Sequence, residues 1–109
     1  MSTQLMSTND DQQIRRFLVR GRVQGVGFRW FVEREASVHL LTGWVRNNDD
    51  GSVEVLAAGS AVGLVTLLQS LHRGPRAARV DGVEELPLGD AGDLKSAIAD
   101  GRRGFWVSA

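Results

Sequence analysis

The chain has 109 residues, and its 13 basic and 13 acidic side chains give a formal net charge of zero. Its length suits one domain, and a content of 42% hydrophobic and 24% charged residues is typical of a globular protein. The zero net charge argues against a general nucleic-acid binder, and the lack of cysteine excludes disulfides, thiolate zinc sites and iron–sulfur clusters.

The first segment of the chain, residues 1–13, is polar and acidic, and we expect a flexible tail there. It has no basic region followed by an apolar stretch, so it does not resemble a signal peptide. No apolar stretch in the sequence approaches the ~20 residues that cross a membrane. We therefore expect a cytoplasmic protein without a membrane partner, with a single folded domain over residues 14–109.

Residues 14–23 alternate between apolar and polar side chains, which predicts a strand with one buried face. Leu18 and several Arg side chains are expected on the exposed face. The buried face is expected to hold Phe17, Val19 and Val23. From about residue 27 the apolar spacing becomes helical, which predicts a helix over 27–38.

A β-hairpin is predicted next. Residues 41–47 and 52–58 both have the character of strands, with Val53, Val55 and Ala57 on one face of the second strand. The turn between them ends in Gly51, which supplies the positive φ that such turns require.

Ser60 is a favourable N-cap for a second helix, and Gly74 with Pro75 ends it. The apolar stripe of this helix consists of Leu64, Leu67, Leu68 and Leu71. Further strands are predicted at 78–86 and 105–107, and the polar segment 87–103 between them contains one potential helical turn at 94–99.

This order of elements is that of a ferredoxin-like α+β sandwich. A βαββαβ chain with a short terminal strand is expected to form a mostly antiparallel sheet. Each predicted helix has one apolar stripe, so both helices are expected on the same face of that sheet.

The segment Gly21–Arg29 is the first candidate site. It contains three Gly, follows a predicted strand and opens a predicted helix, so its backbone N–H groups can form an anion-binding nest at a helix N-terminus. Arg29 in the first helical turn can bind a phosphate through two hydrogen bonds. The spacing fits neither the dinucleotide-binding fingerprint nor the nucleotide P-loop. The residues alone leave open a plain Gly-rich connection with a solvent-facing Arg29.

The second candidate site is the end of the first hairpin strand. The amide of Asn47 offers both a donor and an acceptor, so it can hold a water molecule. Its position just before the turn, taken alone, favours a structural role in that turn. In the same strand, Trp44 is expected to be a buried anchor and Arg46 a solvated residue.

Together, Gly21–Arg29 and Gly43–Gly51 resemble the two signature stretches of acylphosphatases. The resemblance extends over residues 17–85 and 105–109. It implies a small ferredoxin-like enzyme that hydrolyses the carboxyl–phosphate bond of acyl phosphates to a carboxylate and inorganic phosphate. It also implies that no metal or organic cofactor is needed and that the partner is a small-molecule acyl phosphate. For so small an enzyme, a monomer is the expected state.

The resemblance assigns roles to individual residues. The family's phosphate-binding arginine matches Arg29, and its water-positioning asparagine matches Asn47. Its phosphate cradle matches the backbone amides of Gln24, Gly25, Val26, Gly27, Phe28 and Arg29. Phosphoryl transfer depends on charge stabilisation and an in-line nucleophile more than on covalent help, which suits this set of groups. No base is evident near the loop.

Three details go beyond the two signature stretches. Asn48 stands where relatives often have Thr or another small residue, so its help in orienting water is open. His39 stands at the end of the first helix, where many relatives have Gly, and we therefore predict a positive φ at His39. The chain from Phe105 has the right length for the Ala109 carboxylate to pair with Arg29.

Two other function classes are left open by the residues. A catalytically idle phosphate-binding module would keep the loop and could lose Asn47. An RNA-recognition domain has the same strand–helix order, and residues 27–32 superficially resemble its aromatic motif. That motif lies on a central strand in RNA-recognition domains, whereas here it opens a helix.

The neutral net charge hides an uneven distribution. Residues 14–46 contain seven Arg and two acidic residues, and this segment includes the candidate phosphate loop. We therefore expect a positive field near the loop that favours an anionic substrate.

Overall fold

The computed structural model describes residues 12–89 and 105–108. Its elements are β1 (Gln13–Arg22), α2 (Phe28–Val38), β2 (Thr42–Asn47), β3 (Val53–Gly59), α3 (Ala61–Arg73), β4 (Arg79–Leu86) and β5 (Phe105–Ser108). All predicted helices and strands of this part are present, and β1 begins one residue earlier than expected. Residues 1–11 of the predicted tail and the potential helical turn at 94–99 lie outside the described residues.

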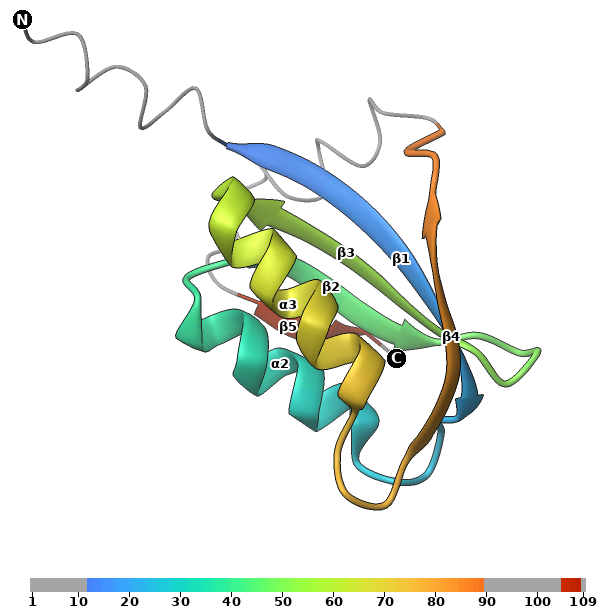
Figure 1. The fold of residues 1–109 in the computed structure, drawn as a ribbon. Coiled ribbons are helices and arrows are strands. Elements are labelled where there is room, and N and C mark those ends of the chain that lie inside the picture. The colour runs from blue at the N-terminus through green and yellow to red at the C-terminus, as the bar shows by residue number, and fades with distance from the viewer. Residues whose placement is uncertain (1–11, 90–104, 109) are drawn as a thin grey trace, which may run out of the picture.

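The strands form one sheet in the order β4-β1-β3-β2-β5. β5 runs parallel to β2, and the other neighbouring pairs are antiparallel. Figure 1 shows α2 and α3 side by side against one face of this sheet. The predicted ferredoxin-like α+β sandwich is therefore confirmed. In the described part of the chain, neither helix is long and apolar enough to cross a membrane.

The core lies between the two helices and the sheet. Its side chains recur every three or four residues on the helices and every second residue on the strands, as the predicted periodicities require. They come from β1 (Phe17, Val19), α2 (Phe28, Val32, Ala36), β3 (Val53, Val55, Ala57) and α3 (Leu64, Leu67, Leu71), together with Val23, Leu41, Val45 and Phe105. Leu68, the fourth residue of the predicted α3 stripe, is partly buried and packs against this core.

The end of α2 differs from the prediction. His39 has a φ of −96°, and the residue with positive φ is Leu40, at 58°. The Leu41 N–H donates to the Ala36 carbonyl at 2.9 Å and the Leu40 N–H to the Ser37 carbonyl at 3.1 Å, which is the Schellman pattern. Leu41 is buried in the core, and this packing makes the residue before it, Leu40, the left-handed one. The prediction for His39 was therefore wrong by one position.

The face of the sheet opposite the helices also differs from the prediction. Leu18 was expected to be exposed, but it is buried, and its cross-strand partner Glu54 is buried on the same face. Glu54 accepts hydrogen bonds from the guanidinium groups of Arg16 and Arg46. The guanidinium carbon of Arg46 lies 4.7 Å from the centre of the Trp44 ring. Arg46 thus belongs to an ion-pair cluster while its side chain remains 43% exposed, so the solvated residue expected at this position also has partners in the fold.

Candidate active site

The loop between β1 and α2 turns sharply at two glycines. Gly25 has a φ of 75° and Gly27 a φ of 78°, which is the left-handed region that favours glycine. A Cβ atom at either position would meet open space. The backbone conformation, and not crowding by neighbours, therefore explains why glycine occurs at both positions. The two turns bring the chain directly into the first turn of α2.

The N-terminus of α2 is arranged to attract an anion. Gly27 is its N-cap, and within the described residues no side chain caps this end and no acidic residue lies in the first turn. The first N–H groups of a helix have no carbonyl partner within it, and the helix dipole adds a partial positive charge there. Arg29 contributes a full positive charge in the same turn. Anions bind readily at such a helix end.

A cavity of about 260 Å³ opens at this end of the molecule. It is lined by Val23, Gly25, Gly27, Phe28, Arg29, Trp30, Glu33, Asn47 and Val107, which come from the β1–α2 loop, α2, β2 and β5. The structure therefore brings together Arg29, Asn47 and three residues of the predicted phosphate cradle. Gln24 and Val26, the other two residues of that cradle, belong to the loop but do not line the cavity in the described part of the structure.

Asn47 reaches the cavity from the last position of β2. Its Oδ1 atom is buried and has no hydrogen-bond partner within the described part of the chain. Buried amide oxygens nearly always have a partner, so this acceptor is suited to a water molecule or a ligand in the cavity. The structural role in the hairpin turn, which was the alternative considered for Asn47, is filled by its neighbour Asn48. Its backbone N–H donates to the Ser52 carbonyl at 2.9 Å, and its Nδ2 to the Ser52 hydroxyl at 3.1 Å.

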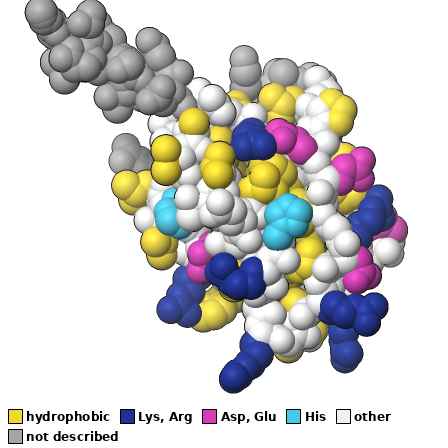
Figure 2. All heavy atoms as spheres, in the orientation of Figure 1, with side chains coloured by type: hydrophobic (Ala, Val, Ile, Leu, Met, Phe, Trp, Pro, Cys, Tyr) yellow, Lys and Arg dark blue, Asp and Glu magenta, His cyan; other side chains and the backbone are white. Residues whose placement is uncertain are grey.

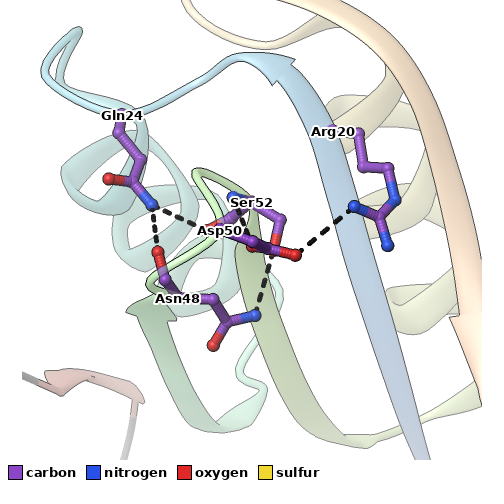
Figure 3. Close-up of polar contacts among 5 residues, drawn as sticks. All are labelled: Arg20, Gln24, Asn48, Asp50 and Ser52. Atoms are coloured by element: carbon purple, nitrogen blue, oxygen red, sulfur yellow. Dashed lines mark hydrogen bonds and ion pairs between the residues drawn. The ribbon is translucent and has the colours of Figure 1, made fainter.

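Gln24 joins the loop to the hairpin turn that follows Asn47. Figure 3 shows its side chain reaching across to this turn, where Nε2 donates to the carbonyls of Asn48 at 2.8 Å and Ser52 at 2.9 Å. The Ser52 hydroxyl and backbone N–H in turn donate to Asp50, which holds the pKa of that carboxyl below its usual range. These contacts fix the loop relative to the strand that carries Asn47. From the sequence, only the backbone amide of Gln24 was expected to take part in the site, and its side-chain contact was not.

Trp30, Glu33 and Val107 also line the cavity, although the sequence did not indicate them as site residues. Glu33 lies four residues after Arg29 on α2, and residues with this spacing share one side of a helix. No base was evident near the loop from the sequence, but an acidic residue, Glu33, lines the cavity. Val107 enters through the pairing of β5 with β2, and no local sequence pattern indicates that contact.

The family of the chain follows from comparison with known proteins. The sequence model of the acylphosphatase family matches residues 15–96. The chain belongs to the acylphosphatase family. Over 95 residues it is 52% identical to an acylphosphatase of Koribacter versatilis, a match that covers 87% of this chain and 86% of the relative. Over 93 residues it is 46% identical to an acylphosphatase of Nitrobacter hamburgensis, covering 85% and 92% of the two chains.

Solved acylphosphatase structures have the same fold. The crystal structure of acylphosphatase from Bacillus subtilis matches with a TM-score of 0.74 at 34% identity, covering 88% of this chain and 98% of that one. An acylphosphatase from Coxiella burnetii matches with a TM-score of 0.74 at 32% identity, covering 93% and 97%. Acylphosphatases hydrolyse acyl phosphates, and this member of the family is accordingly a hydrolase that acts on the anhydride of a carboxylate and phosphate.

The positive charge of residues 14–46 is partly neutralised by carboxylates from other parts of the fold. Several Arg of residues 14–46 form ion pairs with carboxylates of the described chain: Arg15 with Glu85, Arg16 and Arg46 with Glu54, and Arg20 with Asp50. Figure 2 nevertheless shows most of the Lys and Arg side chains of the visible face towards the end of the molecule where the β1–α2 loop lies. The positive field is thus concentrated at that end.

Proposed function

We propose that Arg29 and the backbone N–H groups of residues 24–29 bind the phosphate of an acyl phosphate, and that Asn47 positions the attacking water. The observation that carries this proposal is the shared cavity. Arg29 and Asn47 come from different elements, yet both line the cavity at the positive end of α2. Asn47 also has a buried Oδ1 atom without a hydrogen-bond partner in the described part of the chain, which is an acceptor available to a bound water.

The proposed reaction needs no covalent intermediate. Arg29 and the loop amides hold the non-bridging phosphate oxygens and stabilise the charge of the transition state. Asn47 accepts a hydrogen bond from water and holds its oxygen in line with the bond to be broken. The water oxygen bonds to phosphorus as the bond from phosphorus to the acyl oxygen breaks, and the carboxylate leaves with the electron pair. A phosphate oxygen receives the water's proton.

A carboxylate is a good leaving group, so the reaction requires no general acid in the protein. The Ala109 carboxylate, which the resemblance suggested as a partner of Arg29, lies outside the described residues. Asn48 makes its hydrogen bonds within the turn. We therefore assign the proposed water contact to Asn47 and not to Asn48.

We further propose that the chain acts as a cytoplasmic monomer with one folded domain at 14–109. One sheet joins β1 to β5, which supports a single folded domain, and a monomer is the expected state for so small an enzyme. Sedimentation equilibrium at catalytic concentrations tests the monomer: a mass near that of one chain is expected, and a stable dimer would contradict it.

Hydrolysis of acetyl phosphate by matched variants tests the two side-chain roles. We expect Arg29→Ala to lose both affinity for inorganic phosphate and turnover, and Arg29→Lys to recover little because a Lys cannot form the two-pronged contact. Asn47→Ala should keep phosphate affinity while kcat falls about 10²- to 10³-fold, as for loss of one preorganised transition-state contact. Thermal unfolding of each variant checks that it is folded. Full activity of Asn47→Ala would exclude the water-positioning role.

A further inference from the structure

The active-site cavity extends beyond the groups proposed to hold phosphate and water. Part of its lining is apolar, and two of these side chains, Trp30 and Val107, are also largely solvent-accessible. Trp30 is 62% exposed and Val107 39% exposed. A phosphate with four oxygen atoms takes about the space of four waters, or roughly 120 Å³ at about 30 Å³ each. The cavity of about 260 Å³ therefore has room for more than phosphate.

The exposure of Trp30 is unusual for its residue type. Tryptophan is on average a highly buried residue, and an exposed aromatic ring beside a cavity is a common feature of binding sites. Trp30 directly follows Arg29 in α2. Both residues line the same cavity, so a ligand whose phosphate is bound by Arg29 can extend towards the Trp30 side chain.

The Trp30 ring is held in place by its neighbour on the helix. The guanidinium carbon of Arg34, one turn further along α2, lies 5.3 Å from the centre of the ring. This cation–π contact restricts the rotation of the Trp30 side chain. A ring that is already ordered loses less conformational entropy when a ligand packs against it.

Glu33 gives the same region a negative charge. This residue lines the cavity together with Trp30. An acyl group that carries its own carboxylate would be repelled there, whereas an uncharged acyl group would not. The apolar and the acidic residues thus select for the same kind of acyl group.

We propose that Trp30 and Val107 form the binding site for the acyl group, and that this site favours an uncharged aromatic or large apolar acyl group. In the same scheme, Glu33 disfavours acyl groups that carry a free carboxylate. This proposal rests on the phosphate-binding role proposed for Arg29. Trp30 is a specificity-determining residue in this scheme, because its contact is with the acyl group and not with the phosphate.

The test compares benzoyl phosphate with acetyl phosphate as substrates. Wild type should have a higher kcat/KM for benzoyl phosphate, and Trp30→Ala should reduce the benzoyl-to-acetyl ratio about tenfold. Trp30→Phe should retain most of the ratio, because a smaller ring still stacks on the acyl group. Val38→Ala serves as the control, since Val38 is another exposed apolar residue of α2 but does not line the cavity. It should leave the ratio unchanged.

Succinyl phosphate, whose acyl group carries a free carboxylate, tests the role of Glu33. Glu33→Gln should raise the succinyl-to-acetyl ratio of kcat/KM about three- to fivefold at low salt, and the gain should shrink at high salt. The proposal is overturned if Trp30→Ala changes the kcat/KM of acetyl and benzoyl phosphate by the same factor, or if Glu33→Gln leaves the succinyl ratio unchanged. If wild type hydrolyses none of the three substrates, the proposed function itself fails, which is a distinguishable result.

Discussion

At the scale of single residues, Leu40 carries the clearest local strain in the described chain. It is the one non-glycine residue there with a positive φ, at 58°, and its side chain is 87% exposed. The left-handed conformation costs an L-residue roughly 1–2 kcal/mol, and an exposed side chain has little packing to offset that cost. Leu40→Gly should therefore raise the free energy of unfolding by about 0.5–1 kcal/mol, since the greater freedom of glycine in the unfolded chain cancels part of the gain. Urea denaturation measures the change.

His39→Gly is the matched control for Leu40→Gly. His39 has a φ of −96°, which any residue adopts, so glycine relieves no strain there and only increases the entropy of the unfolded chain. We expect this variant to be less stable than wild type by about 0.5–1 kcal/mol. Stabilisation by His39→Gly together with destabilisation by Leu40→Gly would place the left-handed residue at His39 after all.

At the scale of elements, local periodicity was sufficient to predict both helices and all five strands. The reason is that the core-facing side chains recur every three or four residues on the two helices and every second residue on β1 and β3. The left-handed residue after α2 was misplaced because it depends on which residue, here Leu41, the core accepts. The contact of Val107 with the cavity was missed because it depends on the pairing of β5 with β2, which no local pattern reveals.

In the candidate site, too, residues with a local sequence signal were predicted, and contacts between distant segments were not. Arg29 and Asn47 were found because each lies in a recognisable segment, and the fold brings both to one cavity. The side chain of Gln24 donates two hydrogen bonds to carbonyls of the hairpin turn, and we call this pair of contacts the Gln24 clamp. It was not predicted, since the two acceptors are 24 and 28 residues away along the chain. Glu33 had a visible signal, its spacing of four residues from Arg29 on a helix. That signal becomes meaningful only when the side of the helix that faces the cavity is known.

Removal of the Gln24 clamp should loosen the phosphate loop. Gln24→Ala deletes two hydrogen bonds to carbonyls of the hairpin turn, so we expect a loss of about 1–2 kcal/mol in unfolding free energy. We also expect a weaker affinity for inorganic phosphate, because the loop amides are no longer fixed relative to β2. Calorimetric titration with phosphate measures the second effect.

Two further substitutions sharpen this test. Gln24→Glu preserves size but directs a carboxylate at two carbonyl oxygens, so it should weaken phosphate binding more than Gln24→Ala does. Gln69→Ala removes an exposed glutamine from α3 and should change neither quantity. Wild-type phosphate affinity in both Gln24 variants would show that the clamp stabilises the turn without shaping the site.

At the scale of the whole molecule, ion pairs tie the strands together on the face of the sheet opposite the helices. Glu54 on β3 pairs with Arg16 on β1 and Arg46 on β2, so one carboxylate links three neighbouring strands. Burial by itself would raise the pKa of Glu54, but the hydrogen bond from Arg16 and the charges of Arg46 and Arg16 outweigh it. The pKa of Glu54 in the folded protein therefore lies below its ordinary value of 4.5.

A depressed pKa in the folded state makes the stability of the protein sensitive to acid. The contribution of the Glu54 carboxylate is fully present above pH 4.5, its ordinary pKa, and is lost as the pH falls through the lower pKa of the folded state. Glu54→Gln removes this contribution and leaves two Arg without their acceptor. We expect it to lower the free energy of unfolding by about 1.5–3 kcal/mol at pH 7, and this deficit relative to wild type should narrow as the pH falls below 4.5.

Urea denaturation of wild type and Glu54→Gln at pH 7, 5, 4 and 3 measures how the deficit changes with pH. Glu85→Gln is the comparison, because Glu85 also pairs with an Arg but its side chain is 48% exposed. An exposed pair contributes little, so this variant should differ from wild type by less than about 1 kcal/mol at pH 7. If the deficit of Glu54→Gln stayed constant from pH 7 to pH 3, its cause would be altered packing of the sheet. A narrowing deficit identifies the buried charge that joins β1, β3 and β2.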